Sequence, residues 1–241
     1  MSFKPLRLTW TLGEMVVQPH PLHLDGLVSY AMLRQAEDIG LLETEAANKT
    51  IREYTQGFAL PFQRVRRDDL QCWAASALLA DEVLENGMRL WTRKVNIYEI
   101  ADLVAEGTLC LGKRAYDGGV LKPMAGRIDT VRGAYKQWFK YIPTRTVKAL
   151  HAYCLGDEER LWELLSPEAG YITHLGPRTR MGLGQVTGFT ITSDEAAGER
   201  WQMRVMPWPI EGAVKAHLAV SPPYWAPENR APAWVHPAVF A

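Results

Sequence analysis

The sequence predicts an α+β fold that contains a ferredoxin-like unit, in which strands and helices alternate in the order βαββαβ. Two observations lead to this prediction. Apolar and polar residues alternate over Val147–Tyr153, as in a strand with one buried face. A helix with an acidic first turn follows at Asp157–Leu165, then a glycine-rich loop, then a β-branched strand at Val186–Ile191. This succession of strand, helix, loop and strand is half of such a unit.

The elements before this half-unit are predicted in the same way. Leu6–Leu12 alternates and reads as a strand, and Leu24–Ala36 has the apolar spacing of a helix. Residues 40–56 are polar and predict a loop or a short exposed helix. Cys72–Leu79 is ambiguous, because its alanines favour a helix whereas its tryptophan and serine would suit a central strand. Met88–Val95 alternates and predicts a strand.

The rest of the chain is expected to be less regular, within a single domain of residues 1–241. Gly112–Gly133 holds five glycines and little core-forming pattern, which predicts a long functional loop or a projecting insertion at about 111–145. The proline-rich tail, about 205–241, is expected to wrap over the domain without regular structure.

The most informative segment is Gly176–Phe189, which packs four glycines and two arginines into one loop. Glycine allows a close backbone approach and positive φ, and arginine presents a planar fork that matches phosphate. The spacing GxGxxxG, leading into a strand, is wrong for a dinucleotide-binding turn. The loop therefore indicates contact with a polyanion, and the alternative is a tight turn with surface charges.

Charge is unevenly distributed in a chain with no net charge, 27 basic against 27 acidic residues. Between Leu111 and Lys148 nine Lys or Arg face two Asp, a net +7. A basic segment of this kind is typical of phosphate-backbone binding, and the alternative is a solvated basic face. Within it, Tyr135–Tyr141 sets aromatic residues between lysines, which suits single-stranded nucleic acid or an ordinary amphipathic segment.

Several functional classes find no support in the sequence. The three cysteines are widely spaced and predict reduced thiols in a cytoplasmic protein, and neither a secretory signal nor a membrane-length apolar run is present. His20 and His23 stand beside two prolines, which argues against a helical metal-ligand pair. No CxxC or HxxxH pair is present either, so we expect no metal. A Walker loop is absent, so ATP is not implied and we expect no cofactor. No serine or cysteine stands in a nucleophile elbow, which argues against a hydrolase.

These residues resemble the RAMP superfamily of CRISPR RNA-binding proteins. Gly176–Val186 matches the C-terminal glycine-rich loop of that superfamily. The opening strand with Leu24–Tyr30, the centre Ala74–Ala77 and the tail motif Pro222–Trp225 are more similar to the Cas-five-type subunit of type IV CRISPR effectors.

The resemblance implies a RAMP fold with a basic, thumb-like insertion and a non-catalytic role. Such a subunit holds the 5′ handle of the guide RNA (crRNA), caps the backbone of an effector ribonucleoprotein and contacts other subunits, including the backbone and large subunits. A role near the target-adjacent motif of double-stranded DNA is implied by analogy alone. No membrane is involved. The expected RNA-binding residues come from the glycine loop and the basic segment. They are Arg178, Arg180, Gly182, Gly184, Lys113, Arg114, Lys122, Arg127, Arg132, Lys136, Trp138, Lys140 and Tyr141.

Two other functions compete with this one. The first is a metal-independent endoribonuclease that processes CRISPR repeat RNA, which needs a general acid and base near the 2′-hydroxyl. Its candidates are four histidines, with Tyr30 or Lys113 as helpers: His20, His23, His151 and His174. The second is an interaction domain that binds no nucleic acid, which leaves the basic segment and the loop arginines unexplained.

Overall fold

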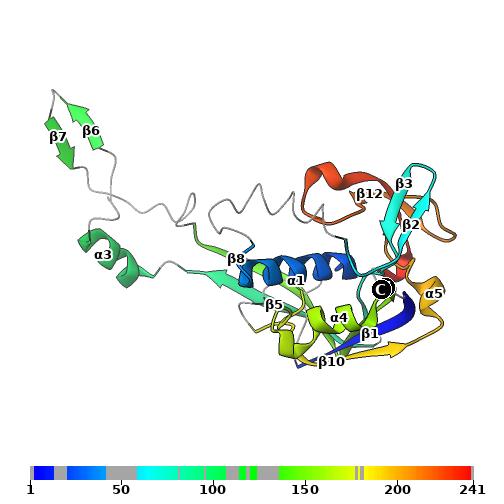
Figure 1. Cartoon of the computed structure of the whole chain (residues 1–241). Helices are drawn as coiled ribbons and strands as arrows, with labels where there is room; N and C mark the ends of the chain where they lie inside the picture. The colour runs from blue at the N-terminus through cyan, green and yellow to red at the C-terminus, as the bar shows by residue number, and fades with distance from the viewer. Residues whose placement is uncertain are drawn as a thin grey trace. The chain divides into compact units, whose positions relative to one another are not determined.

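The computed structural model describes residues 3–13, 21–41, 59–80, 82–94, 96–106, 114–117, 120–123, 136–176, 179 and 182–239. It is a mixed α/β structure with antiparallel sheets and few helices (Figure 1). The chain divides into two compact units, one of residues 1–87 with 143–241 and one of residues 88–142. No helix in the described part of the chain is both long and apolar enough to cross a membrane.

A four-stranded antiparallel sheet forms the centre of the first unit. Its strands lie in the order β10-β1-β9-β4. Strand β1 (Lys4–Leu12) pairs on one side with β10 (Val186–Ser193) and on the other with β9 (Ala149–Gly156). The short strand β4 (Leu79–Ala80) continues the sheet beyond β9. The strands predicted at Leu6–Leu12 and Val186–Ile191 are confirmed as β1 and β10.

The alternation of β1 gives the sheet its buried face. Leu6, Leu8 and Trp10 have no exposed surface, and they belong to one apolar cluster with residues of helix α1 (Leu24–Asp38) and helix α4 (Glu158–Leu165). Full burial of an apolar side chain of this size contributes about 1.5–3 kcal/mol. The pattern of period two in β1 therefore fixes the side of the sheet on which the core forms.

Helices α1 and α4 begin where the sequence predicts. The carboxylate of Asp157 caps α4 by accepting a hydrogen bond from the backbone N–H of Arg160 at 3.2 Å. Helix α1 begins at Leu24, as expected, and runs to Asp38, two residues beyond the predicted end. Residues 42–58, which include most of the polar stretch at 40–56, lie outside the described residues.

The ambiguous segment Cys72–Leu79 is extended and not helical. It begins in β3 (Leu70–Trp73), which forms a hairpin with β2 (Arg64–Arg67). Beyond the hairpin Ser76 is fully buried. Its backbone N–H donates to the carbonyl of Tyr153 at 2.8 Å, and its hydroxyl accepts from the N–H of Tyr153 at 2.9 Å. Backbone pairing with β9 thus overrides the helix propensity of the alanines.

The second unit, residues 88–142, includes parts of strands β5 and β8 and a helix, α3. Strand β5 (Val83–Arg93) pairs with β8 (Trp138–Val147), and the boundary between the two units crosses both strands. The strand predicted at Met88–Val95 is confirmed up to Arg93. Helix α3 (Ile97–Ala105) is capped by the Asn96 side chain, which accepts from the N–H of Tyr98.

The stretch expected to be a long loop or projecting insertion contains regular structure. Strands β6 (Arg114–Asp117) and β7 (Val120–Pro123) form an antiparallel hairpin. The remainder of Gly112–Gly133 lies outside the described residues.

The prediction of an irregular tail is wrong. Residues 205–235 form a three-stranded antiparallel sheet in the order β11-β13-β12. Its strands are β11 (Val205–Met206), β12 (Val214–Ala219) and β13 (Arg230–Val235), and the short helix α5 (Ala197–Arg200) precedes them. Pro232 is tolerated in the middle strand because β11 pairs only with Trp234 and Val235. At Pro232, β13 has a strand neighbour on one side only, so the missing N–H costs no ladder bond.

Candidate functional site

Two short antiparallel segments, residues 173–175 and 184–186, hold the ends of the glycine loop together, and we call them its arms. The N–H of Leu175 donates to the carbonyl of Gly184 at 2.8 Å, and the N–H of Val186 donates to the carbonyl of Thr173 at 2.9 Å. Leu175 and Leu183, which adjoins the second arm, are 1% and 2% exposed, so each arm is anchored in the apolar interior. The two arms therefore fix the points at which the loop leaves and rejoins the core.

Gly184 and Gly182 have different structural roles in the loop. Gly184 has φ +72°, and a Cβ placed there would lie 1.9 Å from the carbonyl oxygen of Leu175. Gly182 has φ +76°, is exposed, and has no atom near the position of a Cβ. Gly184 is thus required by the closeness of the two arms, and it is buried. Of these two predicted RNA-binding residues, only Gly182 offers an open backbone surface. Arg178 and Arg180 lie outside the described residues.

A pocket of about 380 Å³ lies between this loop and α1, and we call it the glycine-loop pocket. It is lined by three residues of Leu22–Tyr30 and by residues of the first arm, of the segment just before it and of the loop. The lining residues are Leu22, Leu27, Tyr30, Tyr171, Ile172, Thr173, His174, Gly176 and Thr179.

The lining combines aromatic rings with polar groups. Tyr30 is 48% exposed, and Tyr171 lies across the pocket just before the first arm of the loop. The imidazole Nδ1 of His174 lies 3.1 Å from the hydroxyl of Thr173. Tyrosine rings can stack on unpaired bases, and hydroxyl and imidazole groups can pair with base edges or phosphates. Sequence analysis named His174 as a candidate histidine with Tyr30 as a helper, but it gave no sign that both line one pocket, and it did not single out Tyr171.

Two of the other candidate histidines, His23 and His151, are buried. His23 is buried, its Nε2 accepts from the N–H of Val205 at 3.2 Å, and its ring stacks on Tyr224 at 4.2 Å. Burial and the nearby positive charge of Arg204 lower the pKa of His23 well below its usual value. It is a neutral core residue, not an open acid or base. His151 is buried in β9, and His20 lies outside the described residues.

Beside the pocket, three segments that carry the family resemblance meet at one buried arginine. Arg204 has no exposed surface and forms an ion pair with Asp25 at 2.9 Å. It also donates to the hydroxyl of Tyr224 at 2.7 Å and to the carbonyls of Trp73 and Ala75 at 2.9 Å. Burial alone would lower the pKa of Arg204, but the charge of Asp25 raises it, so the guanidinium stays charged.

These contacts give a structural role to the three motifs on which the family resemblance rests. The hydroxyl of Tyr224 donates to Asp25 at 2.8 Å, and a Cβ on Gly26 would lie 3.2 Å from the Tyr224 ring. We call Asp25, Arg204 and Tyr224 the buried cluster. It joins the start of α1, the centre of the chain and the tail. Sequence analysis missed Arg204, because no motif surrounds it.

The predicted binding residues of the basic segment are placed less completely. Lys136, Lys140 and Tyr141 are exposed and Trp138 is half-buried. Since side chains alternate along a strand, Trp138 and Lys140 share one face of β8 and Tyr141 lies on the other. Arg114 lies in β6 and Lys122 lies in β7. The remaining predicted residues lie outside the described part of the chain: Lys113, Arg127 and Arg132.

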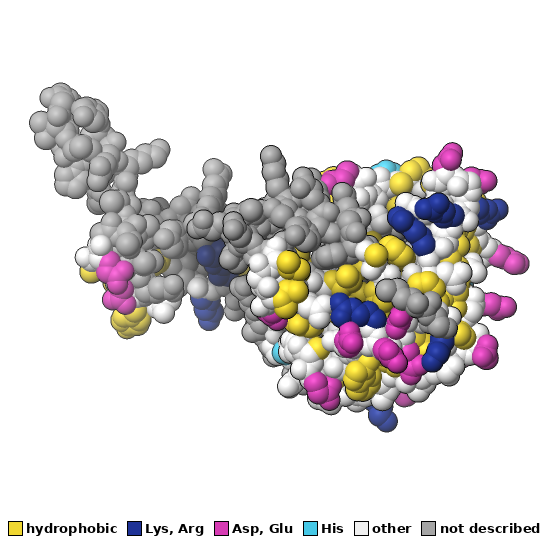
Figure 2. Space-filling model, viewed as in Figure 1, with side chains coloured by type: hydrophobic (Ala, Val, Ile, Leu, Met, Phe, Trp, Pro, Cys, Tyr) yellow, Lys and Arg dark blue, Asp and Glu magenta, His cyan; other side chains and the backbone are white. Residues whose placement is uncertain are grey.

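Basic and acidic side chains are interspersed over the described surface of the face drawn in Figure 2. The shape and residues of the glycine-loop pocket, and not its charge, identify the candidate site.

The chain was compared with models of protein families. The model of the family described as CRISPR type IV associated protein Csf3 matches residues 4–236. No curated protein matches the sequence.

Proposed function

The chain belongs to the Csf3 family of CRISPR type IV associated proteins, and on this premise we propose that it is a non-catalytic, guide-RNA-binding subunit. It holds the 5′ handle of the crRNA and caps the backbone of a type IV effector ribonucleoprotein. Its protein partners are the backbone and large subunits, and the complex acts in the cytoplasm as antiviral defence. By analogy, it lies near the target-adjacent motif of double-stranded DNA.

The glycine-loop pocket is the observation that carries this proposal. Two tyrosine rings and three polar side chains line a cavity beside a loop in which Gly176, Gly182 and Gly184 have positive φ. Arg178 and Arg180 flank Thr179, which lines the same cavity. Rings that stack bases beside cations that hold phosphates are the usual means of gripping single-stranded RNA.

The arrangement of the core sheet supports the finer assignment of the fold. In chain order the elements are β1, α1, β4, β9, α4 and β10, and the sheet order places the last strand beside the first. This is the succession of a ferredoxin-like βαββαβ unit. We therefore propose a RAMP-type, RRM-like core, with the basic segment as its thumb.

The first test is a filter-binding titration of the purified chain with repeat-derived RNA, labelled at its 5′ end, at several salt concentrations. The variant Arg178→Ala/Arg180→Ala should bind more weakly. Because two phosphate contacts are lost, the slope of log K against log salt should fall by about 1.4. The matched control is Arg66→Ala/Arg67→Ala, which removes two exposed arginines from the β2–β3 hairpin. Equal losses in both variants would refute a specific role for the loop.

A second pair of variants tests the pocket itself. Tyr30→Ala should weaken RNA binding by about 1–3 kcal/mol, the usual contribution of one stacked base. The control is Tyr98→Ala, which removes a tyrosine that is 79% exposed in the second unit. If Tyr30→Ala binds RNA as tightly as the unmodified chain, the pocket does not hold a base.

One observation favours a second candidate function, metal-independent cleavage of repeat RNA. His174 and Tyr30 line the same pocket, and an imidazole and a phenol can serve as general base and general acid. The test is to incubate the chain with repeat RNA in the presence of a chelator and to run the products on a denaturing gel. Defined cleavage that disappears in His174→Ala and falls in Tyr30→Phe would establish this function. Intact RNA with tight binding supports the non-catalytic subunit.

A further inference from the structure

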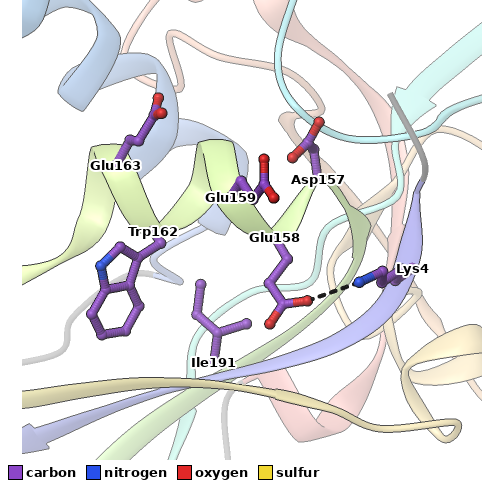
Figure 3. A pocket seen from close by; sticks show the side chains of 7 residues that line it. All are labelled: Lys4, Asp157, Glu158, Glu159, Trp162, Glu163 and Ile191. Atoms are coloured by element: carbon purple, nitrogen blue, oxygen red, sulfur yellow. Dashed lines mark hydrogen bonds and ion pairs between the residues drawn. The ribbon is translucent and has the colours of Figure 1, made fainter.

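A second, larger pocket lies at the start of α4, where the helix meets the core sheet. It has a volume of about 1010 Å³. Its lining, drawn in Figure 3, comes from β1, α4 with its cap, and β10. The lining residues are Lys4, Asp157, Glu158, Glu159, Trp162, Glu163 and Ile191, and we call this the α4 groove.

The groove contains an apolar surface. Glu158 and Trp162, four residues apart on α4, both extend toward the sheet, and Ile191 of β10 stands between them (Figure 3). Trp162 is 45% exposed, although its ring lies 5.6 Å from that of the buried Phe189. A tryptophan that is half in the core and half in solvent is a typical anchor of a protein interface.

The charge of the groove is strongly negative. Four carboxylates and one lysine line it, and Lys4 is paired with Glu158 at 3.2 Å. Glu163 is paired with Arg160 at 2.7 Å, whereas Glu159 has no ion-pair partner among the described residues. A surface of this sign repels RNA phosphates and attracts cationic side chains. The groove therefore does not extend the RNA site proposed above, and its ligand is a cation-bearing one.

The groove borders an edge of the core sheet. In the described part of the chain, β10 is the last strand of that sheet and pairs with β1 alone. It is eight residues long, and Thr190 and Thr192 are exposed. A long, uncharged edge strand is a ready template for another strand, and many proteins use such an edge to bind an extended segment of a partner.

We propose that the α4 groove and the edge of β10 together dock an extended, Lys/Arg-bearing segment of a protein partner. The segment adds to the sheet beside β10. One of its apolar side chains packs on Trp162 and Ile191, and its cationic side chains pair with Glu159 and the neighbouring carboxylates. Charge complementarity selects this occupant over nucleic acid. The proposal is independent of RNA binding, because it uses different residues of the first unit.

The test uses the full chain and a fluorescein-labelled peptide that alternates lysine and valine over about eight residues, the length of β10. Fluorescence anisotropy at low salt should show binding that weakens as salt is added. The charge reversal Glu159→Lys should weaken the binding about tenfold, and so should Trp162→Ser. The matched control, Glu211→Lys, reverses an exposed charge that is not part of the groove and should change little.

Three results would overturn the proposal: equal binding of a glutamate–valine peptide, equal losses in Glu159→Lys and Glu211→Lys, or no binding at low salt. Repeat-derived RNA provides the second readout. Glu159→Lys should retain RNA affinity, which shows that the variant is folded and separates this proposal from the RNA-binding function. Displacement of the bound peptide by RNA would assign the groove to nucleic acid and refute protein docking.

Discussion

Replacement of Gly184 by alanine should destabilise the protein far more than the same change at Gly182. The left-handed conformation costs alanine about 1–2 kcal/mol at either position. At Gly184 the new Cβ would also lie 1.9 Å from the Leu175 carbonyl oxygen, so the two arms must separate. That movement sacrifices the 2.8 Å hydrogen bond from Leu175 to Gly184, about 1 kcal/mol, and loosens the buried Leu183. We expect a loss of about 3–4 kcal/mol for Gly184→Ala and about 1–2 kcal/mol for Gly182→Ala.

Urea unfolding followed by tryptophan fluorescence measures both variants against the unmodified chain. The free energies are compared through the midpoints, and the slopes must be equal for the comparison to hold. The difference between the variants isolates the steric term, because the conformational cost is common to both. If Gly184→Ala is no less stable than Gly182→Ala, the close approach of the two arms is wrong.

Three further predictions concern the interior of the first unit. Arg204→Met should lower the free energy of unfolding in urea by about 3–5 kcal/mol, because it leaves the buried carboxylate of Asp25 without its ion-pair partner. A loss below 1 kcal/mol would refute the buried cluster. The pKa of His23 is lowered in the folded state, so the unfolded chain binds its proton more readily, and stability should fall as pH drops below about 6.5. His23→Gln should flatten that fall, and an unchanged pH profile would show that His23 is not buried as described. Burial raises the pKa of the Cys72 thiol to about 11 and that of the Cys154 thiol further. A Cys110→Ser variant should therefore show no rapid reaction with a thiol reagent at pH 8 until urea unfolds it.

Local patterns were enough to predict the core elements. β1 alternates cleanly, β10 is rich in β-branched residues, and α4 carries its own start signal in Asp157, whose carboxylate caps the helix. These features depend on residues close together in the sequence. The boundary between β8 and β9 at Lys148 escaped prediction, because the alternation continues through it.

Features that depend on distant segments could not be predicted from local patterns. Tyr30 and His174 are far apart in sequence, and only the packing of α1 against the glycine loop brings them together. Prolines in the tail suggested irregular structure, but Pro232 stands in β13 beyond the residues that pair with β11, and so does not break the sheet. Arg204 has no local signature, since its partners come from three separate segments.

The position of β1 in the sheet has a consequence for synthesis of the chain. Both of its partners, β9 and β10, come far later, at Ala149–Gly156 and Val186–Ser193. At typical ribosomal rates roughly 10–40 seconds pass between the emergence of β1 and that of β10. During this time the side chains of Leu6, Leu8 and Trp10 cannot be buried by the complete core sheet. The nascent chain therefore presents an apolar strand to the cell before the fold can close over it, and its yield depends on protection of that strand until translation is nearly finished.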